Sequence, residues 1–230
     1  WITGGAFDVT VSPLVELWGF GAEGREQNVP AESAIAAALK EIGFQHLQLD
    51  FTEPRVTLTS PVQVDLSGVA KGYGVDMIAQ WLERQGINDY LVEIGGEIRA
   101  AGKSPRGDDW RVGIEKPAGL NAAVERAIRV SGVGLATSGD YRNYFEKDGK
   151  RYSHTLDPKT GYPISHKTAS VTVIAETAAY ADALATGFLV LGAEKSLALA
   201  ETHGFAVYVI EKTDEGFVSS YSSAFAPYLE

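Results

Sequence analysis

The chain of 230 residues contains no cysteine, so it can form no disulfide and no zinc-thiolate or iron–sulfur site. Positive charge is also scarce, since 20 Lys and Arg face 30 Asp and Glu for a net charge of −10. This balance argues against a nucleic acid or an anionic membrane surface as the partner. It leaves a phosphate ligand open, because a bound divalent cation can invert the local field.

Several familiar motifs and long apolar runs are absent as well. No hydrophobic run is long enough to span a bilayer. There is no Walker phosphate loop and no His-Glu-x-x-His helix, and Ser138 lacks a Gly-x-Ser-x-Gly context. These absences give no support to a P-loop nucleotidase, a zinc protease or a serine hydrolase. A hydrophobic content of 45% and a charged content of 22% are ordinary for a globular protein.

The stretch from Val64 to Leu82 reads as a strand end, a turn of small residues and an amphipathic helix. One helical face is predicted from the spacing of Val75, Ile78, Ala79 and Leu82. The turn contains Gly68 and Lys71, which suit close approach of a ligand and binding of a phosphate at a helix N-terminus. An ordinary strand-to-helix connection is the alternative for this stretch taken alone.

A second signal lies in an apolar helix predicted from Ala178 to Leu191. Asp182 and Thr186 are four positions apart in it, so their side chains share one face. An ionised aspartate in such surroundings is costly without a partner. A carboxylate and a hydroxyl are hard oxygen ligands of the kind that magnesium takes together with water and substrate phosphates. The pair therefore suggests a metal site, with a helix-capping or surface pair as the alternative.

His154 is the best candidate for a general base. It lies between Ser153 and Thr155 and close to the turn signature Asp-Pro-Lys-Thr-Gly161. Histidine titrates near neutral pH, which suits proton abstraction from a hydroxyl. A structural or merely exposed histidine is the alternative.

The pattern along the chain predicts an α+β fold of mostly antiparallel strands with several packed helices, as one domain over residues 1–230. Further helices are expected at Pro30–Ile42 and Lys195–Thr202. Gly134–Tyr141 is polar and small, and no helix or strand is assigned to it. The expected strands are His46–Phe51, Val56–Ser60, Val62–Leu66, Tyr90–Ile94, Glu97–Ala101, Trp110–Glu115, Ala123–Val130, Ser170–Ala175 and a terminal hairpin of Phe205–Glu211 with Phe217–Phe225.

Taken together, these motifs resemble those of the bacterial ApbE family of flavin transferases, which move FMN from FAD onto a threonine or serine of a target protein. The resemblance runs in the same order along the whole chain. The matching segments are Gly4-Gly-Ala-Phe-Asp8, Ser12-Pro13, Trp18-Gly-Phe20, Val64-Asp-Leu-Ser-Gly-Val-Ala-Lys-Gly-Tyr73, Ile94-Gly-Gly-Glu-Ile98, Ala136-Thr-Ser-Gly-Asp-Tyr141, Tyr152-Ser-His-Thr-Leu-Asp-Pro-Lys-Thr-Gly161 and Ala181-Asp-Ala-Leu-Ala-Thr186.

The resemblance implies an ApbE-like (T-fold-like) architecture and a magnesium-dependent transfer of FMN from FAD that releases AMP. It implies that magnesium is bound by Asp182, Thr186 and the backbone carbonyl of Gly68, with Asp182 and His154 as the catalytic residues. The FAD site implied by the family's motifs is formed by Ala6, Phe7, Asp8, Asp65, Lys71 and Thr155.

Two other activities fit the same motifs. One is hydrolysis of FAD to FMN and AMP, with water in place of the acceptor hydroxyl, and the other is flavin binding without catalysis. Members of the family usually carry a further N-terminal segment, an export signal and often a lipid-attached cysteine, which this chain lacks. The resemblance therefore implies a periplasmic or other extracytoplasmic protein, held to the membrane as a lipoprotein in its full-length form.

Overall fold

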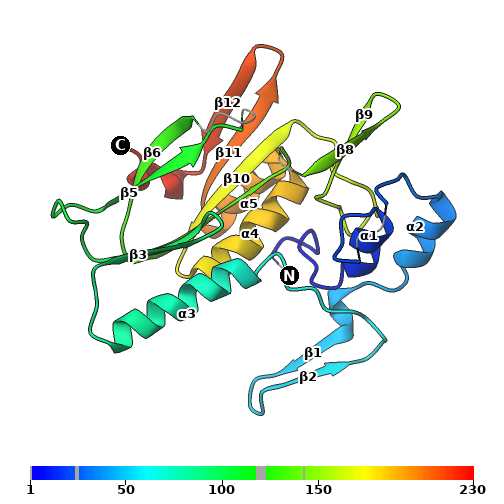
Figure 1. Ribbon diagram of the computed structural model, residues 1–230, viewed down its shortest axis with the longest axis horizontal. Helices are drawn as coiled ribbons and strands as arrows, with labels where there is room; N and C mark the ends of the chain where they lie inside the picture. The colour runs from blue at the N-terminus through cyan, green and yellow to red at the C-terminus, as the bar shows by residue number, and fades with distance from the viewer. Residues whose placement is uncertain (1, 24–25, 118–122, 142) are drawn as a thin grey trace. The chain divides into compact units, whose positions relative to one another are not determined.

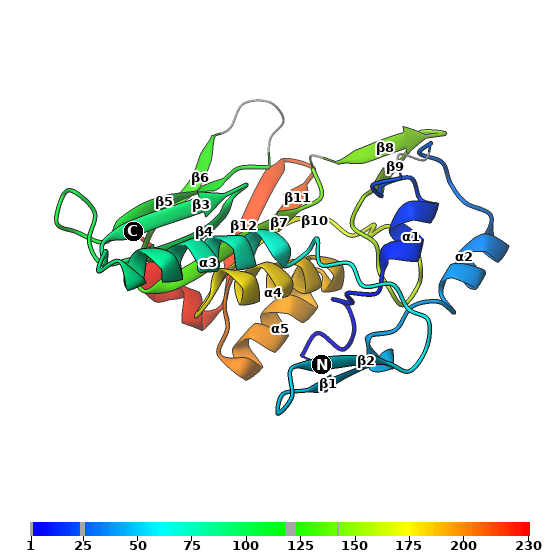
Figure 2. The same cartoon turned by 60° about the horizontal axis from the view of Figure 1, so that its bottom comes forward.

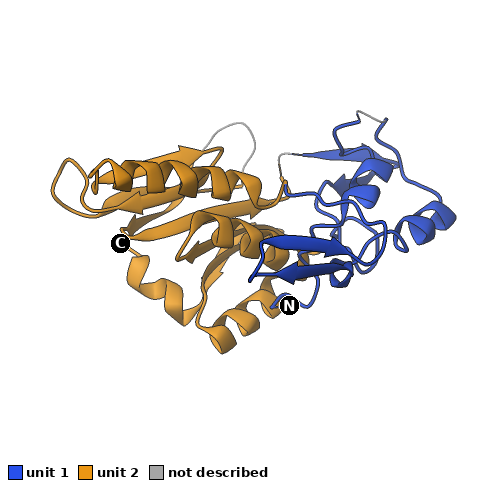
Figure 3. Ribbon diagram, turned by 90° about the horizontal axis from the view of Figure 1, so that it is seen from below, with its two compact units in different colours: residues 1–66, 143–165 blue, residues 67–142, 166–230 orange. Residues whose placement is uncertain are grey.

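The computed structural model describes residues 2–23, 26–117, 123–141 and 143–230. The chain divides into two compact units, which Figure 3 draws in different colours. Unit 1 comprises Trp1–Leu66 and Asn143–Ser165, and unit 2 comprises Ser67–Arg142 and His166–Glu230. Unit 1 is thus made of two stretches of chain that are separated by 76 residues of unit 2 (142 − 66).

Unit 2 is built on a six-stranded sheet in the order β12-β11-β10-β7-β4-β3 (Figure 1). Every neighbouring pair in it is antiparallel. The central strand β10 is buried over almost its whole length, which explains its run of β-branched and small residues. The strands are β3 (Tyr90–Ile94), β4 (Glu97–Ala101), β7 (Val133–Gly139), β10 (Thr168–Ala175), β11 (Ala206–Thr213) and β12 (Gly216–Tyr221).

Three helices pack against one face of this sheet, as Figure 2 shows. They are α3 (Ala70–Arg84), α4 (Ala178–Leu191) and α5 (Ala193–His203). Helix α4 is the innermost of them: it packs on β7 and β10, and α3 packs on α4. Its alanines and Gly187 make it narrow enough for this position, and eight of its residues are buried.

The opposite face is covered by the hairpin of β5 (Trp110–Glu115) and β6 (Val124–Val130) with the short helix η2 (Ser223–Tyr228). Ile114, Ile128 and Phe225 from these elements join the core beneath the sheet. Alternate residues of the sheet strands face this core, for example Tyr208 and Ile210 in β11.

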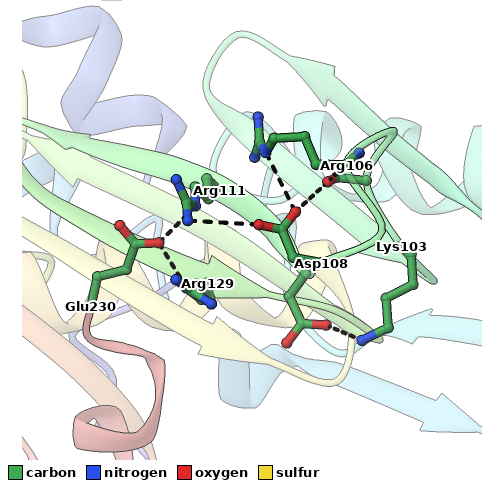
Figure 4. Close-up of polar contacts among 8 residues, drawn as sticks. Lys103, Arg106, Asp108, Arg111, Arg129 and Glu230 are labelled. Carbon is green, nitrogen blue, oxygen red and sulfur yellow. Dashed lines mark hydrogen bonds and ion pairs between the residues drawn. The ribbon is translucent and has the colours of Figure 1, made fainter.

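Ion pairs tie the chain end to this hairpin. Arg111 of β5 and Arg129 of β6 both reach the carboxylate of Glu230, at 2.9 and 2.7 Å (Figure 4). Arg111 and Arg106 also contact Asp108 at 3.6 and 3.4 Å. These side chains are partly exposed, so the network adds little stability per pair and mainly fixes the last residue of the chain.

Unit 1 has shorter elements around a small core. Trp18 and Leu14 are fully buried in it, and the indole N–H of Trp18 donates to the carbonyl of Gly161 at 2.9 Å. Phe145 and Tyr152 stack on each other and lie against Trp18. The elements of unit 1 are α1 (Ser12–Leu17), α2 (Glu32–Ala38), η1 (Phe44–His46), β1 (Leu47–Asp50), β2 (Arg55–Leu58), β8 (Tyr144–Lys147) and β9 (Lys150–Ser153).

The expected α+β class with antiparallel sheets is confirmed, but one expected strand is not formed in the described structure and one central strand was not predicted. In the described structure Val62–Leu66 is not part of a strand, and the N–H of Asp65 donates to the carbonyl of Val9 at 2.6 Å rather than to a neighbouring strand of a sheet. Gly134–Tyr141 includes most of β7, a central strand that was not predicted because its residues are small and partly polar. None of the described helices has the length and hydropathy needed to cross a membrane.

Candidate active site

Asp182 is the single acidic residue of α4, and only 3% of its surface is exposed. Within the described part of the chain its one hydrogen bond comes from the backbone N–H of Gly72, which donates to Oδ2 at 3.2 Å. Gly72 belongs to the first turn of α3, and 110 positions separate the two residues. The contact therefore joins the N-terminal end of α3 to the acidic residue of α4.

Burial raises the pKa of Asp182, and the N–H of Gly72 and the charge of Lys71 oppose that rise only in part. A carboxylate in this position is under-solvated, and a cation on its other oxygen would relieve the cost. Thr186 lies one helical turn further on and adds a hydroxyl on the same side. The donor set thus fits a hard divalent cation such as magnesium.

No group of three or more histidine, aspartate or glutamate side chains is placed to hold a metal within the described ranges. A cation at Asp182 would therefore depend on one carboxylate, a hydroxyl, backbone oxygen and oxygens of water or substrate. This is a usual coordination pattern for magnesium beside a phosphate substrate.

The hydroxyl of Thr186 is oriented by the sheet. Its Oγ1 lies 3.2 Å from Oγ of Ser138 in β7. In the same strand, Thr137 bonds to Thr172 of β10 at 2.8 Å. Ser138 is thus a hydrogen-bond partner of the Thr186 hydroxyl, and this bond limits how the Thr186 side chain can rotate.

Gly68 lies in the turn just before α3, whose helical residues begin at Ala70. The family resemblance implies that its carbonyl lies within coordination reach of a cation at Asp182. The Gly72–Asp182 bond places this turn beside Asp182, since Gly68 is only four positions before Gly72. The two stretches expected to form one site thus meet in unit 2, and coordination by Gly68 itself stays a prediction.

Lys71 precedes Gly72 and makes an ion pair with Glu97, Nζ to Oε1, at 2.5 Å. Glu97 is 1% exposed, and its second oxygen has no hydrogen-bond partner among the described residues. Burial raises the pKa of Glu97, and the bond to Lys71 partly offsets that rise. Lys71 is therefore held by the buried carboxylate of Glu97, while its half-exposed side chain remains accessible to a ligand.

The hairpin turn next to this ion pair requires glycine. Gly95 and Gly96 connect β3 and β4 with φ of +63° and +102°, which only glycine adopts without strain. A Cβ on Gly95 would also lie 3.3 Å from Cδ of Lys71. The glycine pair thus lets the backbone of the turn lie close to the side chain of Lys71.

In unit 1, Asp8 binds backbone and hydroxyl groups of its own unit. Its Oδ1 accepts from the N–H and the hydroxyl of Thr10, at 2.8 and 2.7 Å, and its Oδ2 accepts from the N–H of Phe44 at 3.0 Å. Thr10 in turn accepts from the N–H of Gly43 at 2.6 Å. Asp8 thus holds the loop before η1 against the N-terminal turn, and its predicted contact with flavin would come in addition to this role.

The other predicted flavin-binding residues near the N-terminus lie close to Asp8. Ala6 is buried, and the N–H of Phe7 donates to the hydroxyl of Thr3 at 3.1 Å. Asp65 joins this region through its bond to the carbonyl of Val9. The structure therefore brings Ala6, Phe7, Asp8 and Asp65 together within unit 1.

His154 directly follows β9 and bonds through Nδ1 to the carbonyl oxygen of Asn143 at 2.9 Å. A carbonyl can only accept, so Nδ1 carries the proton and the lone pair of the neutral ring is on Nε2. This tautomer suits a general base.

Thr155, a predicted flavin-binding residue, is held by bonds of its own backbone. Its N–H donates to the hydroxyl of Ser153 at 3.1 Å, and its carbonyl accepts from the N–H of Ile164 at 3.0 Å.

Two residues of unit 2, Glu97 and Asp76, were not predicted from the sequence to belong to the site. Glu97 was part of a recognised motif but received no role, although a glutamate beside paired glycines could have raised the question. Asp76 of α3 is buried and binds the start of α4. Nothing local marks it, because its partners lie more than 100 positions away.

The candidate site thus lies on a helix that packs on an antiparallel sheet. Its buried carboxylate binds a glycine-containing turn next to a lysine. The model of the ApbE family matches residues 1–209. A Haemophilus influenzae relative named FAD:protein FMN transferase is 49% identical over the whole chain and 67% of its own length. The relative of that name from Vibrio cholerae is 48% identical over 99% of the chain and 68% of its own length.

Solved structures agree with these matches. The apo flavinyl transferase ApbE of Pseudomonas stutzeri superposes with a TM-score of 0.89 at 45% identity, covering 99% of this chain and 70% of that one. The ApbE protein of Thermotoga maritima gives 0.85 at 36% identity, covering 100% and 74%. The chain belongs to the ApbE family and spans about two thirds of the length of these curated relatives. The resemblance inferred from the motifs, to a family of flavin-transferring enzymes, is thereby confirmed.

Proposed function

We propose that this chain transfers FMN from FAD to the hydroxyl of a threonine or serine in a target protein, with AMP as the leaving group. The observation that carries the proposal is the buried carboxylate of Asp182, bonded to the N-terminal turn of α3 and followed one turn later by Thr186. The relatives' names supply the reaction class, and these contacts supply a place for its charged groups.

The proposed cation is magnesium, held by Asp182, Thr186 and the carbonyl of Gly68. When bound, magnesium would supply Lewis acidity to the pyrophosphate oxygens of FAD. Lys71 would add a positive charge to the same phosphates. Glu97 would hold the lysine in place, because its ion pair anchors the ammonium at the base of the hairpin turn. Ala6, Phe7, Asp8, Asp65 and Thr155 are proposed to contact FAD.

The proposed chemistry exchanges one phosphorus–oxygen bond for another. The acceptor oxygen bonds to the phosphorus of the FMN half, and the bond from that phosphorus to the bridging oxygen breaks, so AMP leaves with the bridging oxygen. The hydroxyl proton goes to a base, and we assign this role to Nε2 of His154. The support is its tautomer, which the Asn143 carbonyl fixes.

The experiment is intact-mass analysis of acceptor peptides with a single threonine or serine, incubated with the protein, FAD and magnesium chloride. The proposal expects a gain equal to one FMN-phosphoryl unit, one AMP per transfer, and no gain in excess chelator. The same peptide with valine in place of threonine is the control.

Two other outcomes separate the alternatives. AMP release that is equally fast without any acceptor indicates an FAD pyrophosphatase. FAD binding with neither transfer nor cleavage in the full-length protein indicates a flavin-binding protein, and it contradicts the proposal.

The family resemblance alone supports a further proposal on location. We propose that the full-length protein works outside the cytoplasm, attached to the membrane by a lipid. Protease accessibility of the full-length protein in spheroplasts tests this. Protection from added protease, with digestion only after lysis, would contradict an extracytoplasmic location.

A further inference from the structure

Asp76 is a buried carboxylate that binds the start of the helix carrying Asp182. It lies on α3, with 6% of its surface exposed. Its Oδ1 accepts from the N–H of Ala178 at 2.9 Å, and its Oδ2 accepts from the N–H of Ala179 at 2.8 Å. Each oxygen thus binds one backbone N–H of the first turn of α4.

These bonds complete the N-terminal turn of α4. A helix leaves its first four N–H groups without intrahelical partners. Thr177 satisfies one of them, since its hydroxyl accepts from the N–H of Tyr180 at 3.2 Å, and its carbonyl accepts the first regular helical bond, from Ala181 at 3.1 Å. Asp76 satisfies two more, those of Ala178 and Ala179. Thr177 therefore caps the helix from its own chain segment, whereas Asp76 ties it to α3.

The link between the helices is reciprocal. Asp76 of α3 binds the first turn of α4, and Asp182 of α4 binds Gly72 in the first turn of α3. The backbones also meet directly, because a Cβ on Gly72 would lie 2.4 Å from the carbonyl oxygen of Ala178. Two polar contacts and one steric contact thus fix both the rotation and the axial position of α4 against α3.

We propose that Asp76 is a positioning residue for the metal site: by holding the first turn of α4 to α3, it sets where Asp182 and Thr186 present their oxygens to the turn containing Gly68. This inference rests on the function proposed above. A carboxylate that only stabilised the fold would affect unfolding, whereas a positioning carboxylate also affects the affinity for the cation.

The test compares Asp76→Asn with Thr177→Ala in the same protein. Asparagine is similar in size but loses the charge and one acceptor oxygen, so one of the two N–H bonds is lost. Thr177→Ala removes a cap from the same turn without touching α3. The probe is magnesium chloride alone, and the readouts are the rise in melting temperature with magnesium and hydrogen exchange of the α4 amides in metal-free protein.

We expect Asp76→Asn to raise the magnesium concentration at half-maximal stabilisation by about 10–100-fold, the usual effect of removing a partner outside the ligand shell. Exchange at the start of α4 should rise in both variants, but the magnesium midpoint of Thr177→Ala should stay at the wild-type value. Equal midpoints for Asp76→Asn and wild type would overturn the inference while leaving the proposed function intact. If wild type itself shows no magnesium-dependent shift, the metal function fails and this inference fails with it.

Discussion

Asp182 combines burial with a shortage of partners, which is a costly arrangement in the absence of a cation. Burial raises its pKa, so the charged form that a metal needs is disfavoured in the metal-free fold. Sites that bind charged ligands often trade stability for function in this way.

Replacing Asp182 by asparagine should therefore have opposite effects with and without metal. Without magnesium, the neutral amide should stabilise the fold by about 0.5–2 kcal/mol, because no charge is buried and an oxygen can still accept from Gly72. With magnesium, the variant should show no further rise in melting temperature and no FMN transfer. Thermal melts in chelator and in magnesium chloride measure both effects. A variant that magnesium stabilises as much as wild type would contradict the assignment of Asp182 as a ligand.

Glu97 predicts a pH dependence of stability. Its pKa is raised by burial above the ordinary value of 4.5. As pH rises past 4.5, the unfolded chain loses this proton while the folded chain keeps it, so folding becomes less favourable. The stability that Glu97 contributes at low pH is thus lost as pH rises through its folded pKa.

Glu97→Gln, which cannot ionise, should remove this component. Denaturation at a series of pH values should give a shallower decline for Glu97→Gln than for wild type above pH 4.5. The exposed neighbour Glu93→Gln serves as the matched control and should follow the wild-type curve. Parallel curves for all three proteins would show that burial of Glu97 does not shift its titration.

The α3–α4 contact is the element on which the site depends, and two glycines of α3 test it. Gly72→Ala would place a methyl group 2.4 Å from the carbonyl oxygen of Ala178, so α4 must move. A cost of about 1–3 kcal/mol is expected from such overpacking, together with weaker binding of magnesium. Gly74→Ala meets only Cδ1 of Ile94, at 3.4 Å, and should stabilise the helix by about 0.5–1 kcal/mol.

Urea denaturation of the two variants measures the free energy of unfolding, which should fall for Gly72→Ala and rise for Gly74→Ala. If Gly72→Ala is as stable as Gly74→Ala and binds magnesium as wild type does, the close approach of the two helices is not what positions Asp182.

Elements with a strong local pattern were predictable, and those defined by their neighbours were not. Helix α4 was predicted with its observed bounds, because Ala178–Leu191 is almost continuously apolar between Thr177 and Gly192. Strand β7 was missed, since its glycine, alanine and serine residues carry little strand preference. Its small residues are explained only by α4: a Cβ on Gly134 would lie 2.2 Å from the nitrogen of Ala178.

The candidate site divides in the same way. The spacing of Asp182 and Thr186 predicted a shared helical face, and the glycines before α3 predicted a close approach. The partners of these groups were beyond local reasoning. In the sequence Asp76 looks like any polar residue of an amphipathic helix. Its buried contact with Ala178 exists only because the fold brings together two residues that are 102 positions apart.

At the scale of the whole molecule, the family match, the antiparallel fold and the contacts of unit 2 all lead to the same reaction class. A chain with a net charge of −10 needs local positive charge to bind a pyrophosphate. Lys71, the N-terminus of α3 and a cation at Asp182 are the groups proposed to supply it. The proposed activity is therefore expected to depend on a metal ion, whose charge would offset the acidic balance of the chain.

The most direct test is the mass of a threonine-containing acceptor peptide after incubation with FAD and magnesium chloride, with wild type and Asp182→Asn compared at equal concentration. The account predicts an FMN-phosphoryl gain with wild type, none with Asp182→Asn, and none with wild type in excess chelator. Equal transfer by both proteins, or transfer by wild type that survives removal of the metal, would contradict it.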